Sequence, residues 1–198
     1  MTVSTIPAPA RSRLTRLGFA DPERTVRLLG AAPLGLVDPE TGEPADAETA
    51  DVLGEIAEAA DPDLAVTGLS RLADAVPDTA ALLAALRDQI GLRRRLLQVL
   101  GASSALADHL ARHPEDWRVL AVDEVATARP NARTLERVLL TAVGADPNSP
   151  PTGTGGSRAR GTGPEVLDAL RIAYRRQLLR LAARDLTGAL TVEEVAAE

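Results

Sequence analysis

The stretch GASSALADHLARHPEDW, residues 101–117, contains both histidines and the only tryptophan of the chain. Gly101 can adopt the left-handed conformation that ends a helix, and Ser103 or Ser104 can cap the helix that follows. Pro114 disfavours helical backbone at the residue before it. The stretch therefore predicts the end of one helix, a second short helix and a corner.

Trp117 lies just beyond the predicted corner, at helical spacing from Leu120. Only 2% of the chain is aromatic, so this indole offers an unusually large apolar surface. Buried tryptophans contribute strongly to the packing around them. We expect Trp117 to anchor the corner against the core.

The composition of the whole chain favours helices. Of its 198 residues, 45% are hydrophobic, mainly Leu, Ala and Val. Leu, Ala and Arg are among the best helix formers, whereas the β-branched and aromatic residues typical of strands are scarce. We therefore predict an all-α protein, an irregular bundle of about eight to ten helices. The absence of cysteine excludes disulfides and thiolate metal sites.

Capping residues and prolines mark where most helices begin. A capping carboxylate followed by a proline at the first helical position is a strong start signal, since proline lacks only a hydrogen-bond donor that the first turn does not use. The expected starts are Asp21-Pro22, Asp46, Asp61-Pro62, Pro77-Asp78 and Thr134. Apolar residues recur at helical spacing after them: Val52, Leu53, Ile56, Leu64, Leu69, Leu72, Val76, Leu82, Leu83, Leu86 and Ile90. Gly30 to Pro44, broken by prolines and glycines, reads as a loop.

Three consecutive arginines, Arg93 to Arg95, lie in the helix predicted for Gly91 to Leu100. Successive residues of a helix are about 100° apart, so the three cannot share one face. We expect them to form a solvated rim with partly buried stems.

These signals divide the chain into four parts. Residues 1–20 are expected to be a disordered tail and lead-in, and residues 21–144 a helical bundle. Residues 145–163 are rich in Pro, Gly, Ser and Thr and predict a flexible linker. Residues 164–198 predict a long amphipathic helix and the start of another.

Pro164 opens the longest predicted helix and Gly188 ends it. Its apolar stripe comprises Leu167, Leu170, Tyr174, Leu178 and Leu181. Thr191 and Glu194 then form a capping box for a further helix. Because that helix has barely begun when the sequence reaches Glu198, we expect the chain to be a truncated product.

Charge is unevenly distributed along the chain. The net charge of −6 argues against general nucleic-acid binding. Leu36 to Asp63 carries ten acidic residues and no basic one, whereas Arg158 to Arg184 carries seven arginines. The long helix displays a row that we call the arginine face: Arg171, Arg175, Arg176, Arg180 and Arg184.

The arginine face is the best functional candidate of the sequence. A solvated or internally paired face, a nucleotide site and a partner site all remain open for it. We expect it to be held against acidic surface, either Leu36 to Asp63 or an adjoining domain. Exposed pairs contribute about 0 to 1 kcal/mol each, so the face should orient domains rather than stabilise the fold.

Two patterns suggest ligand sites but lack what such sites need. His109 and His113 have the four-residue spacing of a zinc-binding pair, but Pro114 moves His113 off the helical face, so we expect surface or capping histidines. The glycines of Thr152 to Gly163 have no preceding strand and no following lysine, so they predict a linker rather than a phosphate loop. No catalytic, cofactor-binding or metal-binding residue is assigned.

The central stretch, with a serine-rich helix entry before DHLARHPEDW, residues 108–117, resembles the amino-terminal region of the bifunctional glutamine synthetase adenylyltransferase/adenylyl-removing enzymes, in their actinobacterial form. Tyr174 to Gly188 is similar to the helix that leads into the first nucleotidyltransferase domain of that family. Leu17 to Leu29 and Ala60 to Leu72 fit its opening segments. The resemblance covers most of the chain apart from the glycine-rich region near residue 150.

The resemblance implies a parent enzyme that uses ATP and Mg²⁺ to adenylylate a tyrosine of glutamine synthetase and removes the AMP by phosphorolysis. It also implies a P-II-type nitrogen-signalling protein as a partner. Nucleotidyl transfer needs paired carboxylates that hold Mg²⁺. In the family these lie in a Ser-Asp-x-Asp motif after a Gly-rich segment, and this sequence has neither, so we expect the fragment alone to be inactive and to bind no cofactor.

The competing interpretation is a free-standing helical interaction module without catalytic activity. The sequence shows no signal peptide and no run approaching the ~20 apolar residues of a membrane span, so a cytoplasmic location is expected for either.

Overall fold

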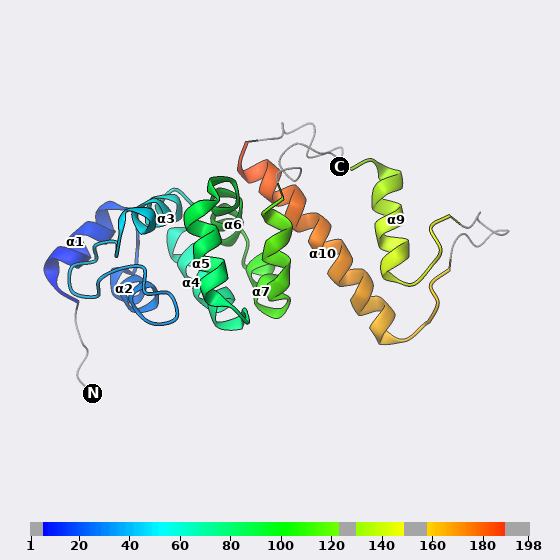
Figure 1. Ribbon diagram of the computed structural model, residues 1–198, viewed down its shortest axis with the longest axis horizontal. Helices are drawn as coiled ribbons and strands as arrows, with labels where there is room; N and C mark the ends of the chain where they lie inside the picture. Colours follow the sequence, from blue (N-terminus) through cyan, green and yellow to red (C-terminus); the bar gives the residue numbers. More distant parts are fainter. Residues whose placement is uncertain (1–5, 123–129, 149–157, 189–198) are drawn as a thin grey trace.

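The computed structural model describes residues 6–122, 130–148 and 158–188, and these contain ten helices and no strand. The all-α prediction is therefore confirmed. The helices are α1 (Ala8–Arg16), α2 (Pro22–Gly30), α3 (Ala47–Ala57), α4 (Pro62–Ala75), α5 (Thr79–Asp88), α6 (Ile90–Ala102), α7 (Ser104–Arg112), the 3-10 helix η1 (Pro114–Leu120), α9 (Ala132–Ala142) and α10 (Pro164–Leu186). They form an elongated molecule with α1 to α3 at one end and α9 and α10 at the other (Figure 1).

The predicted start signals of α2 to α5 are confirmed. In each case the aspartate before the first turn accepts a hydrogen bond from the backbone N–H three residues later: Asp21, Asp46, Asp61 and Asp78. For α9 the cap is Asn131, whose side chain accepts from the N–H of Thr134, so the capping role predicted for Thr134 is wrong. Gly30, where the predicted loop begins, is the last residue of α2, and the rest of that loop up to Pro44 contains no helix.

Helix α1 lies where the sequence predicts a tail and lead-in. Ala10 and Leu14 are fully buried, so the expected disorder of the tail is wrong for Ala8 to Ala10. Ala10 is covered by the turn at Gly42, whose φ of +67° suits glycine and which has no room for a side chain against Ala10. The contact between Gly42 and Ala10, which joins residues far apart in the sequence, therefore helps to order α1. The local sequence of α1 does not predict this contact.

The core is centred on α4 and α6, which lie against each other and against α7. The predicted stripes of α3 and α4 are buried, for example at Val52, Ile56, Leu69 and Leu72. Ile90 is an exception, because it begins α6 and is 69% exposed instead of closing the stripe of α5.

Two of the three consecutive arginines are buried in this core. Arg93 and Arg95 are each 6% exposed, so the predicted solvated rim is correct only for Arg94. Arg93 donates to the carbonyl oxygen of Leu86 (3.2 Å) in the last turn of α5, and Nε of Arg95 donates to the carbonyl oxygen of Leu120 (2.8 Å). Free carbonyls at helix ends need donors, which gives these guanidiniums a structural role.

The prediction that Gly101 ends a helix in a left-handed conformation is wrong, because Gly101 lies inside α6 and does not have a positive φ. A Cβ at this position would come within 2.6 Å of the Cβ of Ala59 and 3.0 Å of the carbonyl oxygen of Asp61. Gly101 is therefore required for close packing of α6 against the turn before α4.

The corner after α7 is confirmed. Ser103 caps α7 through a hydrogen bond from the N–H of Leu106 (3.3 Å), and Pro114 starts η1. Trp117 is buried at this corner. The guanidinium carbon of Arg118 lies over its ring, 4.7 Å from the ring centroid. The anchoring role predicted for Trp117 is thus supported.

Helix α10 crosses the bundle with its second half and extends beyond it with its first half, where it runs antiparallel to α9 (Figure 1). Its buried residues are Ala173, Leu179, Ala183 and Arg184. The predicted apolar stripe lies mostly on another face, since Leu167, Leu170 and Tyr174 are exposed. Gly188 has a φ of +72°, as its predicted stopping role requires.

Residues 149–157 of the predicted linker, and the capping box at Thr191, lie outside the described residues. In the described part of the linker, the N–H of Arg160 donates to the carbonyl oxygen of Val143 (3.2 Å). The flexibility of the linker and the division of the chain into four parts stay predictions. Among the described residues, no helix has an apolar stretch long enough to cross a membrane.

Candidate functional site: a buried carboxylate joining three helices

Asp116 is the buried charge on which α7, η1 and α10 converge. Its Oδ2 lies 2.8 Å from Nε2 of His109, and its Oδ1 accepts a hydrogen bond from Nε of Arg176 at 2.7 Å. Asp116 is 2% and His109 1% exposed. Arg176 also reaches the carboxylate of Glu115 at 3.4 Å. We call Asp116, His109 and Arg176 the buried network.

Local sequence explains half of this geometry. His109 lies near the end of α7, and the turn enforced by Pro114 brings Asp116 back beside it within seven residues. Asp116 also lies in the first turn of η1, where a negative charge is favourable. Arg176 arrives from α10, sixty residues later. The network therefore fixes α10 to the corner.

Burial determines the charge of His109. Removal from water lowers the pKa of His109 below 6.5, and the hydrogen bond and charge of Asp116 oppose this effect. A neutral His109 bonds to Asp116 by donating the proton on Nε2, which assigns the tautomer. His109 is thus neither a surface nor a capping residue, contrary to the prediction.

The arginine face is divided among several environments. Arg171 pairs with Asp168 on its own helix at 2.9 Å, and Arg176 with Asp116. Burial lowers the pKa of Arg180, as do the neighbouring Arg176 and Arg184 guanidiniums, while Asp116 raises it. Arg171 and Arg176 are therefore paired with acids of this chain.

The acidic segment Leu36 to Asp63 does not supply the partners of Arg171 and Arg176. Its carboxylates pair with arginines of α1, α5 and α6: Glu43 with Arg13 (2.7 Å), Asp46 with Arg87 (3.6 Å) and Asp51 with Arg93 (3.4 Å). Asp63 accepts hydrogen bonds from the N–H groups of Ala20 and Asp21. The docking of these two arginines onto this segment, one of the two predicted alternatives, is therefore wrong. That the face orients domains rather than stabilises the fold stays a prediction, and the hydrogen bond of Arg176 to the buried Asp116 argues against it for that residue.

The two histidines lie close together, but one of them is bonded to Asp116. The His109 and His113 rings lie 4.9 Å apart, but Nε2 of His109 is directed to Asp116. Within residues 6–122, 130–148 and 158–188, no group of three His, Cys, Asp or Glu residues could hold a metal ion.

Both oxygens of Asp116 are engaged by positioned donors, so the buried network connects α7, η1 and α10. A cavity of about 300 Å³ lies beside His109, lined also by Arg112, His113, Asp168 and Arg175. Arg112 of this lining pairs with Asp108 at 3.7 Å. The hydrogen bond and charge of Arg71 chiefly lower the pKa of Asp108, and the charges of Arg112 and Arg175 lower it further.

Sequence reasoning missed Asp116 as the centre of the network. Its position in the first turn after a proline is a signal for the helix dipole, which predicts an exposed acid. Only the approach of Arg176 makes burial of that charge favourable, because a buried carboxylate needs charged partners.

Curated relatives match between about three quarters and nearly all of the chain. The bifunctional glutamine synthetase adenylyltransferase/adenylyl-removing enzyme of Streptomyces avermitilis is 43% identical over 94% of the chain. The enzymes of the same name from Mycobacterium tuberculosis and Corynebacterium diphtheriae are 36% and 33% identical over 81% and 76% of it. The chain spans only 16%, 15% and 17% of the lengths of these three relatives. No family model matches the chain, and no solved structure does either.

Proposed function

Because the chain belongs to the bifunctional glutamine synthetase adenylyltransferase/adenylyl-removing enzyme family, of which it matches a fragment, we propose that it is the amino-terminal helical part of such an enzyme. The parent enzyme would adenylylate a tyrosine of glutamine synthetase and remove the AMP by phosphorolysis. The observation that carries the proposal is 43% identity over 94% of the chain.

The helical part would position the catalytic part rather than react. Nucleotidyl transfer needs paired carboxylates that hold Mg²⁺ beside the triphosphate. The sequence of this chain lacks the Ser-Asp-x-Asp motif, and the one fully buried carboxylate of the site is bound to His109 and Arg176. ATP and Mg²⁺ would therefore be bound by the remainder of the parent, and the 198-residue chain alone would be inactive.

Glutamine synthetase would be the macromolecular substrate, and a P-II-type signalling protein a regulatory partner. Both partners are proposed because of the family to which the chain belongs. A cytoplasmic location would follow from these partners. The buried network supports a positioning role, because it fixes the long helix α10 to the bundle. By resemblance, α10 leads toward the first nucleotidyltransferase domain.

Labelled ATP tests this function. The complete parent, incubated with Mg²⁺ and glutamine synthetase, should transfer labelled AMP to a tyrosine of the synthetase, and phosphate should release it. The 198-residue chain alone should transfer none. A reading frame that lacks a Ser-Asp-x-Asp segment after residue 198 would contradict the assignment and favour the free-standing helical module.

A further inference from the structure

Helix α9 is the least supported helix of the molecule. It contains no buried residue, although Leu135, Val138, Leu139 and Leu140 give it an apolar side. It packs mainly against the first half of α10. An isolated helix of this length is marginal in water, and helices in proteins are stabilised chiefly by packing of the apolar face. The apolar side of α9 is therefore only partly satisfied.

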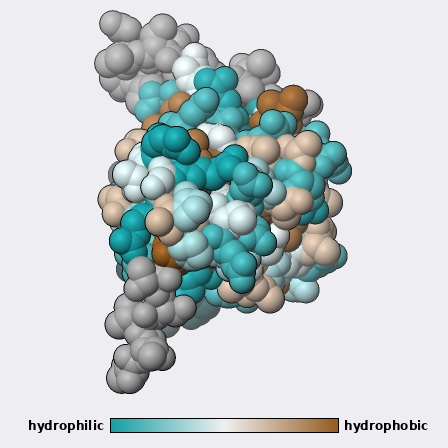
Figure 2. Space-filling view, turned by 90° about the vertical axis from the view of Figure 1, so that its left-hand side faces the viewer, coloured by the Kyte–Doolittle hydropathy of each residue, from teal (hydrophilic) through white to brown (hydrophobic). Residues whose placement is uncertain are grey.

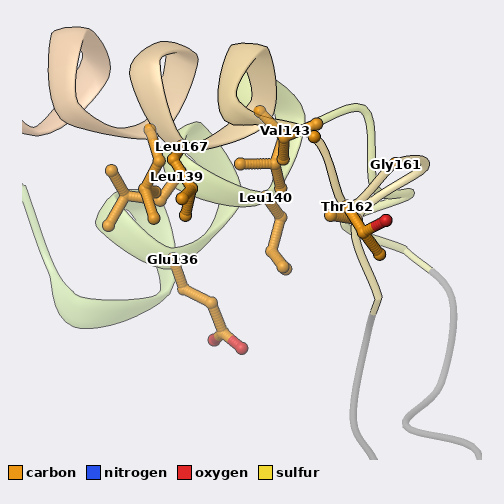
Figure 3. Close-up of a pocket in the computed structure, with 11 residues that line it drawn as sticks. Glu136, Leu139, Leu140, Val143, Gly161, Thr162 and Leu167 are labelled. Atoms are coloured by element: carbon orange, nitrogen blue, oxygen red, sulfur yellow. The ribbon is translucent and has the colours of Figure 1, made fainter.

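An open apolar cleft separates α9 from α10. Its volume is about 590 Å³, and its apolar lining includes Leu139, Leu140, Val143, Val166, Leu167 and Leu170. Figure 3 shows Leu139 and Leu167 facing each other, with the carboxylate of Glu136 directed away from them at the edge. Small-molecule sites normally add several converging polar groups to an apolar wall. Glu136 and Thr162 are the polar side chains here, so the cleft fits an apolar surface better than a small ligand.

The exposed apolar residues continue from this cleft along α10. Leu167 is 53% and Tyr174 54% exposed, and Val138 and Leu170 are also exposed. Clustered exposure of this kind marks interaction surfaces, whereas single exposed residues need no explanation. Two antiparallel helices with an apolar groove between them accept a third helix by ridge-into-groove packing.

We propose that the α9–α10 cleft receives an amphipathic helix from the polypeptide of the parent enzyme outside these 198 residues. This inference rests on the proposed function, since the chain spans only 16% of the length of its Streptomyces relatives and most of the parent lies elsewhere. The docking helix carries aliphatic side chains at helical spacing and a basic residue opposite Glu136. Its docking completes a three-helix unit and holds α10 at a fixed angle to the catalytic part.

Cysteine labelling tests the occupant directly, because the chain contains no cysteine. Leu167→Cys places one thiol in the cleft, and Ile90→Cys places the matched control at an exposed apolar residue of α6. The remainder of the parent, produced as a separate polypeptide, is added in saturating amount. Reaction of Leu167→Cys with a thiol reagent should slow by about tenfold or more, while that of Ile90→Cys should not change.

A second pair of variants measures affinity. Leu167→Asp should weaken binding of the remainder by about tenfold or more, since it places a charge against an apolar helix face. Ile90→Asp should leave binding unchanged. Both residues are exposed, so circular dichroism of both variants should match the unsubstituted chain.

Each other outcome overturns the proposal. A thiol at residue 167 that is protected in the chain alone at every concentration is covered by the chain itself. Protection that grows with chain concentration identifies a second copy as the occupant. Binding of the remainder without protection places the docking surface elsewhere, and a reading frame that stops at residue 198 leaves no occupant. The labelling needs neither ATP nor glutamine synthetase, so a remainder that protects the cleft but transfers no AMP refutes the proposed function and leaves the docking intact.

Discussion

Helices α4 and α9 carry similar sequence signals but have different surroundings. Both begin at a capping side chain and both show apolar residues at helical spacing. Helix α4 buries six residues, Ala65, Val66, Gly68, Leu69, Leu72 and Ala73, whereas α9 buries none. Helical periodicity therefore shows that a face needs a partner, but it does not identify the partner.

The same contrast separates the two ends of the molecule. The end formed by α1 and α2 is largely hydrophilic in Figure 2, with hydrophobic residues scattered over it. The opposite end carries the open α9–α10 cleft. The end shown in Figure 2 therefore presents a largely polar face, whereas the α9–α10 end keeps an open apolar cleft, which is where the proposed continuation into a catalytic part would lie.

The largest test of this contrast compares two leucines. Leu69→Ala in α4 should lower the free energy of unfolding by about 3 kcal/mol, because Leu69 is fully buried and its removal leaves a cavity. Leu167→Ala in α10 should change it by about 0.5 kcal/mol or less, because Leu167 is largely exposed. Urea unfolding of the 198-residue chain, followed by circular dichroism, measures both.

Equal losses for the two leucines would show that the cleft is closed in the isolated chain. The contrast between the buried face of α4 and the exposed apolar face of α10 would then be wrong.

The second test compares the buried carboxylate of Asp116 with the exposed carboxylate of Asp168, each of which pairs with an arginine of α10. Asp116→Ala should destabilise the chain by about 2 kcal/mol, because it leaves the buried His109 without its partner and deprives Arg176 of its closest acid. Asp168→Ala removes only the exposed pair with Arg171 and should cost about 0.5 kcal/mol or less. Unfolding in urea again gives the values, and a loss at Asp168 as large as that at Asp116 would deny the network its special role.

The elements that the sequence predicted correctly depend on neighbours in sequence. Asp21 caps α2 and Ser103 caps α7 through hydrogen bonds that span three residues. The incorrect predictions depend on distant residues. Ala10 is ordered by Gly42, and Asp116 becomes buried through Arg176. Leu167, Leu170 and Tyr174 of the apolar stripe predicted for α10 are exposed, whereas the bundle buries the face with Ala173 and Leu179.

The third test uses two glycines that both lie inside helices, Gly101 of α6 and Gly54 of α3. Gly101→Ala should destabilise the chain by about 1 kcal/mol, because the added Cβ would collide with Ala59. The free-energy cost of this collision exceeds the gain in helix propensity. Gly54→Ala in α3 should stabilise it by roughly 0.5–1 kcal/mol, because nothing lies within 4 Å of the new Cβ. Thermal unfolding gives the two signs, and a stabilising Gly101→Ala would contradict the close approach of α6 to Ala59.

The smallest effect concerns the pH dependence of the buried network. The folded-state pKa of His109 is lowered from 6.5 mainly by burial, so below pH 6.5 the unfolded chain takes up a proton that the folded chain does not. Stability conferred by neutral His109 is therefore fully present above pH 6.5, falls as the pH decreases below 6.5, and stops falling below the folded pKa. Asp38, Asp46 and Asp108 have pKa values lowered by hydrogen bonds to their carboxylates, so their contributions to stability are lost only below the ordinary carboxyl pKa of 3.8, in a separate pH range.

His109→Gln should remove the decline in stability just below pH 6.5, because glutamine can still donate to Asp116 but does not titrate. His113→Gln is the matched control, since His113 lies half-buried at the corner and has no hydrogen bond to Asp116 in the described structure. The urea midpoint of unfolding is measured from pH 7.5 to 5. It should stay constant over this range for His109→Gln, whereas for His113→Gln it should fall with decreasing pH as it does for the unsubstituted chain. A slope that disappears in His113→Gln and persists in His109→Gln would mean that the corner histidine, not the buried network, senses the proton. The attachment of α10 to the bundle would then not depend on the charge of His109.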